Sequence, residues 1–265
     1  MAVDTNSVAF AHRLADAAGA VIRPYFRQRN EVVDKGAGLA TRFYDPVTEA
    51  DKNAETAIRK LIKSEYPADG ILGEEHGHQE GTSGRTWILD PIDGTRAFIT
   101  GRHAWGTLIA LAVDGKPVLG IIDQPVLGER FIGHDGQATV TTAKGTEILK
   151  ARKCPSLSEA IISTTHPRDY FTEAQRLQFE KVSAAARMTY FGGDCYSYAM
   201  VAMGFTDIVV ESGLKPWDVA PLGPILEGAG GVVSDWDGNP FTTGSDIVAS
   251  GDLRVHADAL KILRG

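Results

Sequence analysis

Hydrophobic residues along this 265-residue chain follow two spacings that belong to different kinds of secondary structure. Apolar residues recur every three or four positions over residues 7–26 and 52–66, which predicts two amphipathic helices. Further along, apolar and polar residues alternate over 107–113, 118–122, 130–132 and 139–141, and glycine-containing pairs separate these runs. This second pattern predicts an antiparallel sheet built from hairpins.

The second half of the chain alternates between the two patterns. Short apolar runs predict strands at 160–164, 189–191, 207–211, 231–234 and 247–249, and helical spacing predicts helices at 172–185, 195–203, 217–227 and 256–263. Taken with the first half, this order predicts an α/β fold in which helical layers enclose sheets. We expect one domain over residues 1–265, with an N-terminal lobe over about 1–150 and a C-terminal lobe over about 151–265.

The stretch 87–95, Trp-Ile-Leu-Asp-Pro-Ile-Asp-Gly-Thr, combines a buried-strand pattern with acidic residues. Its apolar start predicts a strand that carries Asp90 to the edge of a sheet, and Pro91 is predicted to end the strand because it has no N–H to donate. Gly94 permits a backbone turn, and residues 95–98 are compatible with a helical turn whose free N–H groups face the carboxylates. Asp90 and Asp93 beside such N–H groups predict a site for a metal ion and a phosphate.

Other acidic residues lie at predicted element ends. Asp51 precedes the second helix, Glu74 and Glu75 follow a short strand at 70–73, and Asp218 opens a predicted helix. Asp51 has an alternative explanation, because Thr48-x-x-Asp51 is also a capping box. These groups offer only oxygen ligands, which favours Mg2+ or Mn2+ over zinc or copper. Several carboxylates in one pocket would repel one another, so more than one metal ion is predicted.

Composition and charge narrow the function classes. The chain is 43% hydrophobic and 23% charged, as in ordinary globular proteins, and its formal charge of −7 with no basic patch argues against a nucleic-acid partner. Cys154 and Cys195 show no metal-binding spacing and suit a reducing compartment. No signal-peptide pattern and no bilayer-length apolar run is evident, so we expect a cytoplasmic protein that does not bind membranes.

The motifs at 45–51, 73–75, 87–95, 217–220 and 228–231 together resemble the inositol monophosphatase family, and the resemblance covers nearly the whole chain. It implies an α-β-α-β-α sandwich, usually a homodimer, that hydrolyses small phosphate monoesters with Mg2+ and is often inhibited by Li+. Glu74, Asp90 and the Ile92 carbonyl would hold the first Mg2+ ion. Asp90, Asp93 and Asp218 would hold the second, and a weaker third ion would lie near Glu74.

The same resemblance implies the catalytic roles. Thr95 with Asp51 would orient and deprotonate the attacking water, and Glu74 completes the catalytic set. The Gly94 and Thr95 N–H groups would hold the phosphate. Water would attack the phosphorus directly, without a phosphoenzyme intermediate.

The alcohol half of the substrate depends on other residues. Glu211 lies seven residues before Asp218, where the family places a substrate-contacting carboxylate, and both are expected to contact substrate. Asp194 stands where the inositol enzymes carry alanine, and this extra acid suits a cationic alcohol. The alternative is that Asp194 caps the helix predicted to begin near residue 195.

Residues 94–101, 105–110 and 120–125 resemble the histidinol-phosphate phosphatase branch, with Ala97 where the inositol branch typically has asparagine. The predicted function is release of L-histidinol from L-histidinol phosphate in histidine biosynthesis. Inositol or sugar phosphates are the alternative substrates; nucleotide phosphates are less favoured because no adenine pocket is evident. A non-catalytic metal-binding protein is disfavoured because every catalytic-type position is filled. The glycine-rich loop at 34–38 either closes over the site or is a plain connector, and the lid residues within 35–44 cannot be assigned.

Overall fold

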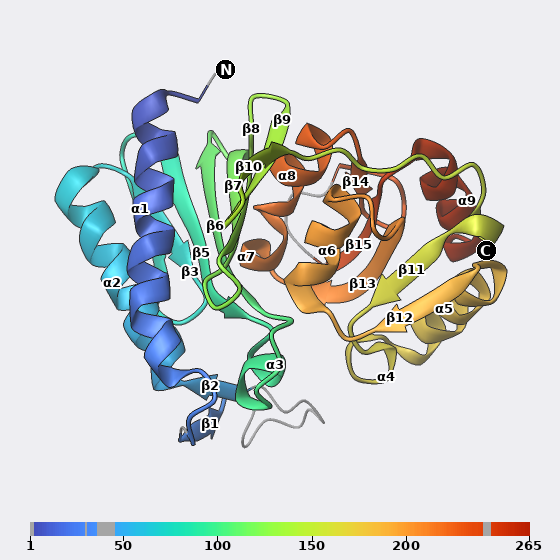
Figure 1. Ribbon diagram of the computed structural model, residues 1–265, viewed down its shortest axis with the longest axis horizontal. Helices are drawn as coiled ribbons and strands as arrows, with labels where there is room; N and C mark the ends of the chain where they lie inside the picture. Colours follow the sequence, from blue (N-terminus) through green and yellow to red (C-terminus); the bar gives the residue numbers. More distant parts are fainter. Residues whose placement is uncertain (1–2, 30, 36–45, 241–244) are drawn as a thin grey trace.

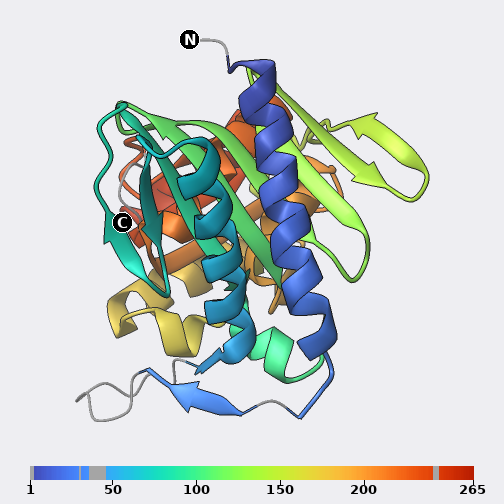
Figure 2. The same cartoon turned by 90° about the vertical axis from the view of Figure 1, so that its left-hand side faces the viewer.

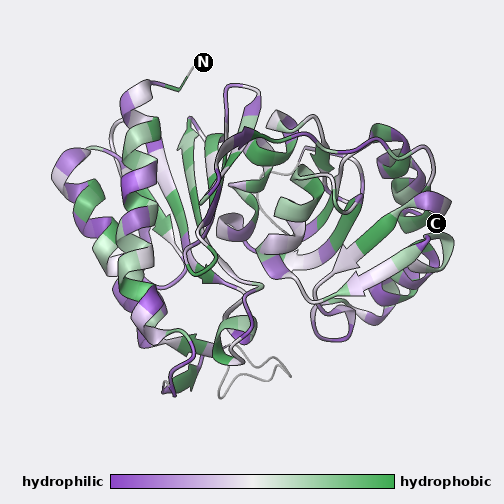
Figure 3. Ribbon diagram, in the orientation of Figure 1, coloured by the Kyte–Doolittle hydropathy of each residue, from purple (hydrophilic) through white to green (hydrophobic). Residues whose placement is uncertain are grey.

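The computed structural model describes residues 3–29, 31–35, 46–240 and 245–265, whose elements form an α-β-α-β-α sandwich (Figure 1). Three clusters of buried hydrophobic residues fill the spaces between successive layers. Figure 3 shows hydrophobic residues gathered on the strands of both sheets, while α1 and α2 carry both kinds of residue. The predicted fold class is therefore confirmed.

The first layer consists of α1 (Thr5–Ile22) and α2 (Glu49–Glu65), which lie side by side over one face of a sheet (Figure 2). Both helices begin at a capping side chain: Asp4 Oδ1 accepts a hydrogen bond from the Ser7 N–H, and Thr48 forms a reciprocal capping box with Asp51. The predicted ranges 7–26 and 52–66 agree with these helices to within a turn.

Among the described residues, the second layer is an eight-stranded sheet with the order β10-β9-β8-β7-β6-β5-β3-β4. All neighbouring strands are antiparallel except β3 and β5, which are parallel. The strands are β3 (Gly70–Gly73), β4 (Gly77–Gln79), β5 (Arg85–Asp93), β6 (Gly106–Val113), β7 (Lys116–Gln124), β8 (Glu129–His134), β9 (Gln137–Thr142) and β10 (Gly145–Ile148).

The middle layer contains α6 (Asp194–Ala202), α7 (Pro216–Val219) and α8 (Leu222–Gly228), between the two sheets (Figure 1). The backbone of α8 approaches β7 closely, since a Cβ atom on Gly120 would lie 2.1 Å from the Pro221 carbonyl oxygen. The single helix predicted over 217–227 is wrong. The chain breaks at Pro221, which has no N–H with which to continue the helical hydrogen bonds of α7.

The outer half is a five-stranded sheet, in order β12-β11-β13-β15-β14, covered on its outer face by α5 and α9. Strand β11 is parallel to both β12 and β13, and β15 is antiparallel to both β13 and β14. Its elements are β11 (Ile161–Thr164), α4 (Pro167–Tyr170), α5 (Glu173–Ala185), β12 (Met188–Phe191), β13 (Ile208–Leu214), β14 (Val232–Ser234), β15 (Ser245–Ser250) and α9 (Leu253–Leu263).

Several short elements were not predicted. They are β1 (Val32–Asp34), which pairs with β2 (Pro46–Thr48), the strands β4 and β10, the helix α4, and 3₁₀ turns at Arg23–Tyr25 and Leu157–Glu159. The helical turn predicted at 95–98 is present as α3 (Thr95–Ile99). Residues 36–45, which contain most of the glycine-rich loop and of the 35–44 stretch, lie outside the described part of the chain. The division into two lobes near residue 150 stays a prediction. Across the described ranges, no helix is both long and apolar enough to cross a bilayer.

Candidate metal and phosphate-ester site

A bulge in β5 brings two carboxylates to one side of the sheet. From Asp90 to Asp93 the strand advances three residues, while its partner β6 advances two, from Leu108 to Gly106. Side chains three positions apart in a regular strand point to opposite faces, and one extra residue restores them to the same face. The prediction that Pro91 ends the strand is therefore wrong: β5 continues to Asp93, because a proline is tolerated within a bulge.

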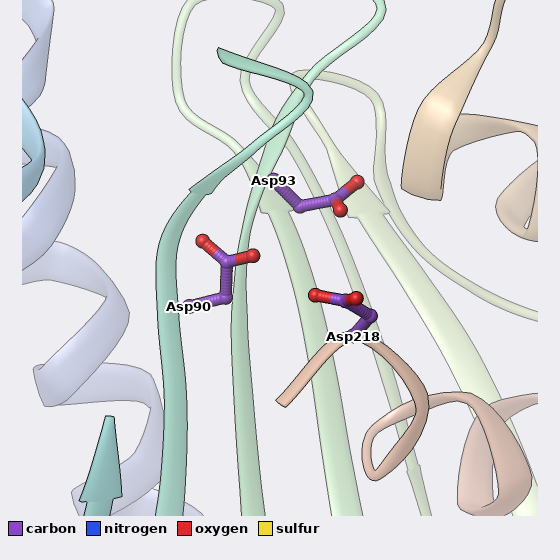
Figure 4. A group of neighbouring side chains, drawn as sticks. All are labelled: Asp90, Asp93 and Asp218. Atoms are coloured by element: carbon purple, nitrogen blue, oxygen red, sulfur yellow. The ribbon is translucent and has the colours of Figure 1, made fainter. Parts of the chain in front are cut away.

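Asp218, on α7, completes a cluster with these two residues. One carboxylate oxygen of each aspartate lies within 4.8 Å of the others, and the three side chains point toward one another (Figure 4). Backbone N–H groups hold two of the carboxylates in place: Asp93 Oδ2 accepts from Cys195 N at 2.7 Å, and Asp218 Oδ2 accepts from Lys215 N at 2.7 Å. Asp93 thereby ties β5 to the start of α6.

The electrostatics of this cluster favour a bound cation. Burial, and then the charges of Glu74, Asp93 and Asp218, raise the pKa of Asp90 well above its usual range. Burial followed by the charge of Asp93 raises the pKa of Asp218 in the same way. A divalent cation would remove this repulsion, and the donors are hard oxygens, so the residues fit Mg2+ or Mn2+.

Glu74 lies at the end of β3, next to the cluster. Its Oε1 is 2.7 Å from the Lys35 ammonium, which also lies 3.0 Å from Glu75 Oε1. Burial raises the pKa of Glu74 to about 7, against the opposing effect of Lys35. Glu55 of α2 fixes this turn, because its carboxylate accepts hydrogen bonds from the Glu75 N–H at 2.8 Å and the His76 N–H at 3.2 Å.

Thr95 and Asp51, the pair predicted to orient water, each have other partners. The Thr95 hydroxyl donates to the Ile92 carbonyl at 3.0 Å, and Asp51 Oδ2 accepts from the Thr48 N–H at 2.9 Å and the Thr48 hydroxyl at 2.6 Å. The capping alternative for Asp51 is therefore correct as a description of its contacts. Burial raises the pKa of Asp51 to about 6. Within the described ranges no hydrogen bond joins Thr95 to Asp51, and their catalytic roles stay predictions.

Gly94 occupies the tight turn that the sequence predicts between β5 and α3. Its φ of +84° is in the left-handed region, and a Cβ atom there would lie 2.9 Å from the Ala104 carbonyl oxygen and 3.0 Å from Asp194 Cβ. This position requires glycine for two independent reasons, and it places Asp194 directly against the turn that follows the metal cluster.

Asp194 and Glu211 supply negative charge beside the cluster. Asp194 does not cap α6: the N-cap is Gly193, Asp194 itself has φ +45°, and the Cys195 N–H bonds to Asp93. Burial, then the charges of Asp93 and Glu211, raise the pKa of Asp194. Glu211 Oε1 accepts from the Thr165 N–H at 2.6 Å and the Thr165 hydroxyl at 2.8 Å, and burial raises its pKa to about 7.

These residues surround one cavity of about 610 Å³ between the two sheets. Of the acidic residues proposed from the sequence and described here, Asp51 and Glu75 do not line it. Thr165 and Tyr198 also line the cavity and were missed, because single residues outside any motif carry no signal before the chain is folded. Lys35, which begins the predicted 35–44 stretch, lines it too. The predicted site residues at the cavity are Glu74, Asp90, Ile92, Asp93, Gly94, Thr95, Asp194, Glu211 and Asp218.

Comparisons with curated proteins, solved structures and family models all indicate the same family. The bifunctional phosphatase IMPL2 (chloroplastic) of Arabidopsis thaliana is 44% identical over 96% of this chain and 74% of its own length. A histidinol-phosphatase from Chlorobaculum parvum is 35% identical over 88% of this chain and 87% of its own length. A solved structure of an inositol monophosphatase from Zymomonas mobilis is 42% identical, covers 98% of both chains and has a TM-score of 0.86. A model of the inositol monophosphatase family matches residues 4–264, and the chain therefore belongs to that family.

Proposed function

We propose that this protein is a Mg2+-dependent phosphomonoesterase that hydrolyses L-histidinol phosphate to L-histidinol and phosphate. The observation that carries the proposal is the cavity itself, where Asp90, Asp93 and Asp218 converge while Asp194 and Glu211 add negative charge to the same space. The first group suits metal ions and a phosphate, and the second suits a cationic alcohol.

Two or three metal ions would be held by the carboxylates. Glu74, Asp90 and the Ile92 carbonyl would bind the first, and Asp90 would share the second with Asp93 and Asp218. When bound, such ions activate a water and stabilise the oxygens of an in-line displacement at phosphorus. The Lys35 ammonium, 2.7 Å from Glu74, neutralises part of the charge on that side of the cavity.

The protein's own groups would position the reactants. Thr95 would orient the attacking water, and Asp51, with a pKa of about 6, is suited to accept its proton near neutral pH. For this, the Thr95 hydroxyl exchanges its bond to the Ile92 carbonyl for one to water. The N–H groups of Gly94 and Thr95, at the start of α3, would hold the phosphate.

The choice of alcohol rests on charge. Histidinol carries an ammonium group, for which Asp194 and Glu211 provide counter-charges, whereas a neutral polyol has no positive charge to pair with these two carboxylates. The relatives named histidinol-phosphatase support the same substrate. We infer a place in histidine biosynthesis, in the cytoplasm, on this basis.

Inositol 1-phosphate or a sugar phosphate is the second candidate, because the Zymomonas mobilis inositol monophosphatase is 42% identical to this chain. The test is phosphate release from a panel of monoesters with and without Mg2+. We expect kcat/KM to be highest for L-histidinol phosphate and release to stop when EDTA replaces Mg2+. A higher kcat/KM for inositol 1-phosphate would overturn the proposed substrate.

We also infer a homodimer. Edge strand β12 exposes the side chains of Met188, Tyr190 and Phe191, each more than half accessible, on the outside of the five-stranded sheet. Exposed apolar side chains grouped on one strand are typical of a contact surface. Sedimentation velocity should give twice the 28.4 kDa chain mass, and a monomer at micromolar concentration would contradict the inference.

A further inference from the structure

Tyr198, a residue in the wall of the cavity, carries a buried hydroxyl group whose hydrogen-bond donor is unused in the described part of the chain. It lies on α6, its residue is 4% exposed, and it is one of the cavity-lining residues. Within the described part of the chain, its buried hydroxyl has no hydrogen-bond partner. Buried hydroxyl groups are almost always paired, so a polar atom that is absent from the free chain is expected to complete this one.

The surroundings of the hydroxyl indicate what kind of atom that is. After burial, the charges that raise the pKa of Tyr198 most are the carboxylates of Glu211, Asp93 and Asp218. Each of these already accepts a hydrogen bond from a backbone N–H, and ionised carboxylates can only accept. These carboxylates supply hydrogen-bond acceptors to the cavity, and the Tyr198 hydroxyl would add a donor beside them.

We propose that the Tyr198 hydroxyl donates a hydrogen bond to the leaving alcohol, and that in histidinol phosphate its acceptor is the unprotonated ring nitrogen of the imidazole. This inference rests on the proposed function. A neutral imidazole has one N–H donor and one acceptor nitrogen. Asp194 and Glu211 can pair with the ammonium or the ring N–H, but neither can satisfy the acceptor nitrogen, whereas a phenol can.

The same helix offers a matched control. Tyr196, two residues away, donates its hydroxyl to Glu129 on β8 and does not line the cavity. Tyr198→Phe and Tyr196→Phe therefore remove the same atom from the same element. The Tyr198 hydroxyl belongs to a cavity-lining residue and has no partner in the described part of the chain, whereas the Tyr196 hydroxyl bonds to Glu129.

The experiment measures both variants with L-histidinol phosphate and with L-alaninol phosphate, which has the ammonium but no ring. For Tyr198→Phe we expect KM for histidinol phosphate to rise about tenfold, with kcat within about twofold and KM for alaninol phosphate unchanged. Its urea unfolding midpoint without substrate should not fall. Tyr196→Phe should lower that midpoint and leave both KM values unchanged.

Two failures are distinguishable. If the wild-type protein does not hydrolyse histidinol phosphate, the proposed function fails and the imidazole assignment fails with it. If the wild type does hydrolyse it, but Tyr198→Phe changes both KM values equally, changes neither, or lowers the unfolding midpoint as Tyr196→Phe does, then only the role of Tyr198 is overturned. In that case the hydroxyl serves the fold and not the substrate.

Discussion

The side chain of Asp93 has two roles, one in the proposed metal cluster and one in anchoring α6. Its carboxylate belongs to the proposed metal cluster, and its Oδ2 also accepts the hydrogen bond from the Cys195 N–H at the start of α6. A substitution at this position can therefore act on metal binding, on the anchoring of α6, or on both. An asparagine separates these effects, because its amide oxygen still accepts a hydrogen bond while the charge is lost.

We expect Asp93→Asn to reduce Mg2+-dependent phosphate release by on the order of a hundredfold or more, with the protein still folded. The charge that helps to hold the cation is lost while the bond to α6 is kept. Phosphate release and circular dichroism are the measurements. Asp258→Asn, on the exposed face of α9, is the control and should retain full activity. Full activity in Asp93→Asn would contradict the proposed metal cluster.

Asp194→Asn tests the charge of the alcohol pocket. Asparagine tolerates the left-handed backbone at φ +45°, so the substitution removes charge with little strain. We expect KM for histidinol phosphate to rise about tenfold or more, and that for inositol 1-phosphate to change little. Steady-state kinetics on both substrates measure the difference. Equal losses on the two would show that Asp194 does not select the cationic alcohol.

At the scale of elements, His256 illustrates how the last helix is attached. It lies on α9, where its ring nitrogens are 2.8 Å from Ser234 Oγ on β14 and 3.1 Å from Ser250 Oγ on β15. Burial lowers its pKa to about 4 from an ordinary value near 6.5. The folded state therefore favours the neutral ring, and α9 stays bonded to the edge of the five-stranded sheet.

This attachment predicts an acid-sensitive contribution to stability. Because the pKa of His256 is lower in the folded protein, its contribution is complete above pH 6.5 and is lost as the pH falls toward 4. We expect the wild type to lose about 2–3 kcal/mol of unfolding free energy over this window from His256, and His256→Gln to lack that part of the loss. Urea unfolding at a series of pH values measures both. Parallel curves for the two proteins would contradict the prediction.

Elements also differ in how far the sequence predicts them. Helices and long strands have a full period of hydrophobic spacing, and most of them were located to within about a turn, with the helix predicted over 217–227 and the end of β5 as exceptions. The three-residue strands β1, β2 and β4 are too short for any alternation, and their pairing comes from partners elsewhere in the chain. The predictions at Pro91 and Pro221 were wrong in opposite ways. Strand β5 continues past Pro91 through a bulge, whereas the single helix predicted over 217–227 is divided at Pro221.

The residues of the site also divide into those that the sequence predicts and those that it does not. Its acidic residues lie in compact motifs with recognisable spacing, so they could be named before the structure was known. Thr165 and Tyr198 belong to no motif and become part of the site only through long-range packing. The left-handed backbone of Asp194, which rules out the capping alternative, likewise has no signal in the sequence.

At the scale of the whole molecule, the buried acids make metal-free protein sensitive to pH. Burial raises the pKa of Asp51 to about 6 and that of Glu74 to about 7, both above their ordinary values. Raised pKa values mean that ionisation of these groups destabilises the folded state as the pH rises through this range. At neutral pH, ionisation of these buried acids therefore lowers the stability of the folded state, and a bound cation can offset this loss.

We accordingly expect Mg2+ to raise the unfolding temperature more at pH 8 than at pH 5.5, because it binds the ionised carboxylates. At pH 5.5 many of these groups are protonated and the cation has to displace protons. Thermal unfolding in Mg2+ and in EDTA at both pH values is the measurement. An equal shift at the two pH values would indicate that the acids are already ionised in the metal-free fold.

The three aspartates of the cluster are supplied by β5 and by α7, which are separated by nearly half of the chain. During translation, the ribosome delivers Asp90 and Asp93 long before Asp218 leaves the exit tunnel. A nascent chain that ends before Asp218 has only two of the three aspartates of the cluster. If the proposed function holds, hydrolysis would begin only late in synthesis, and affinity for the divalent ion would report when the two halves have come together.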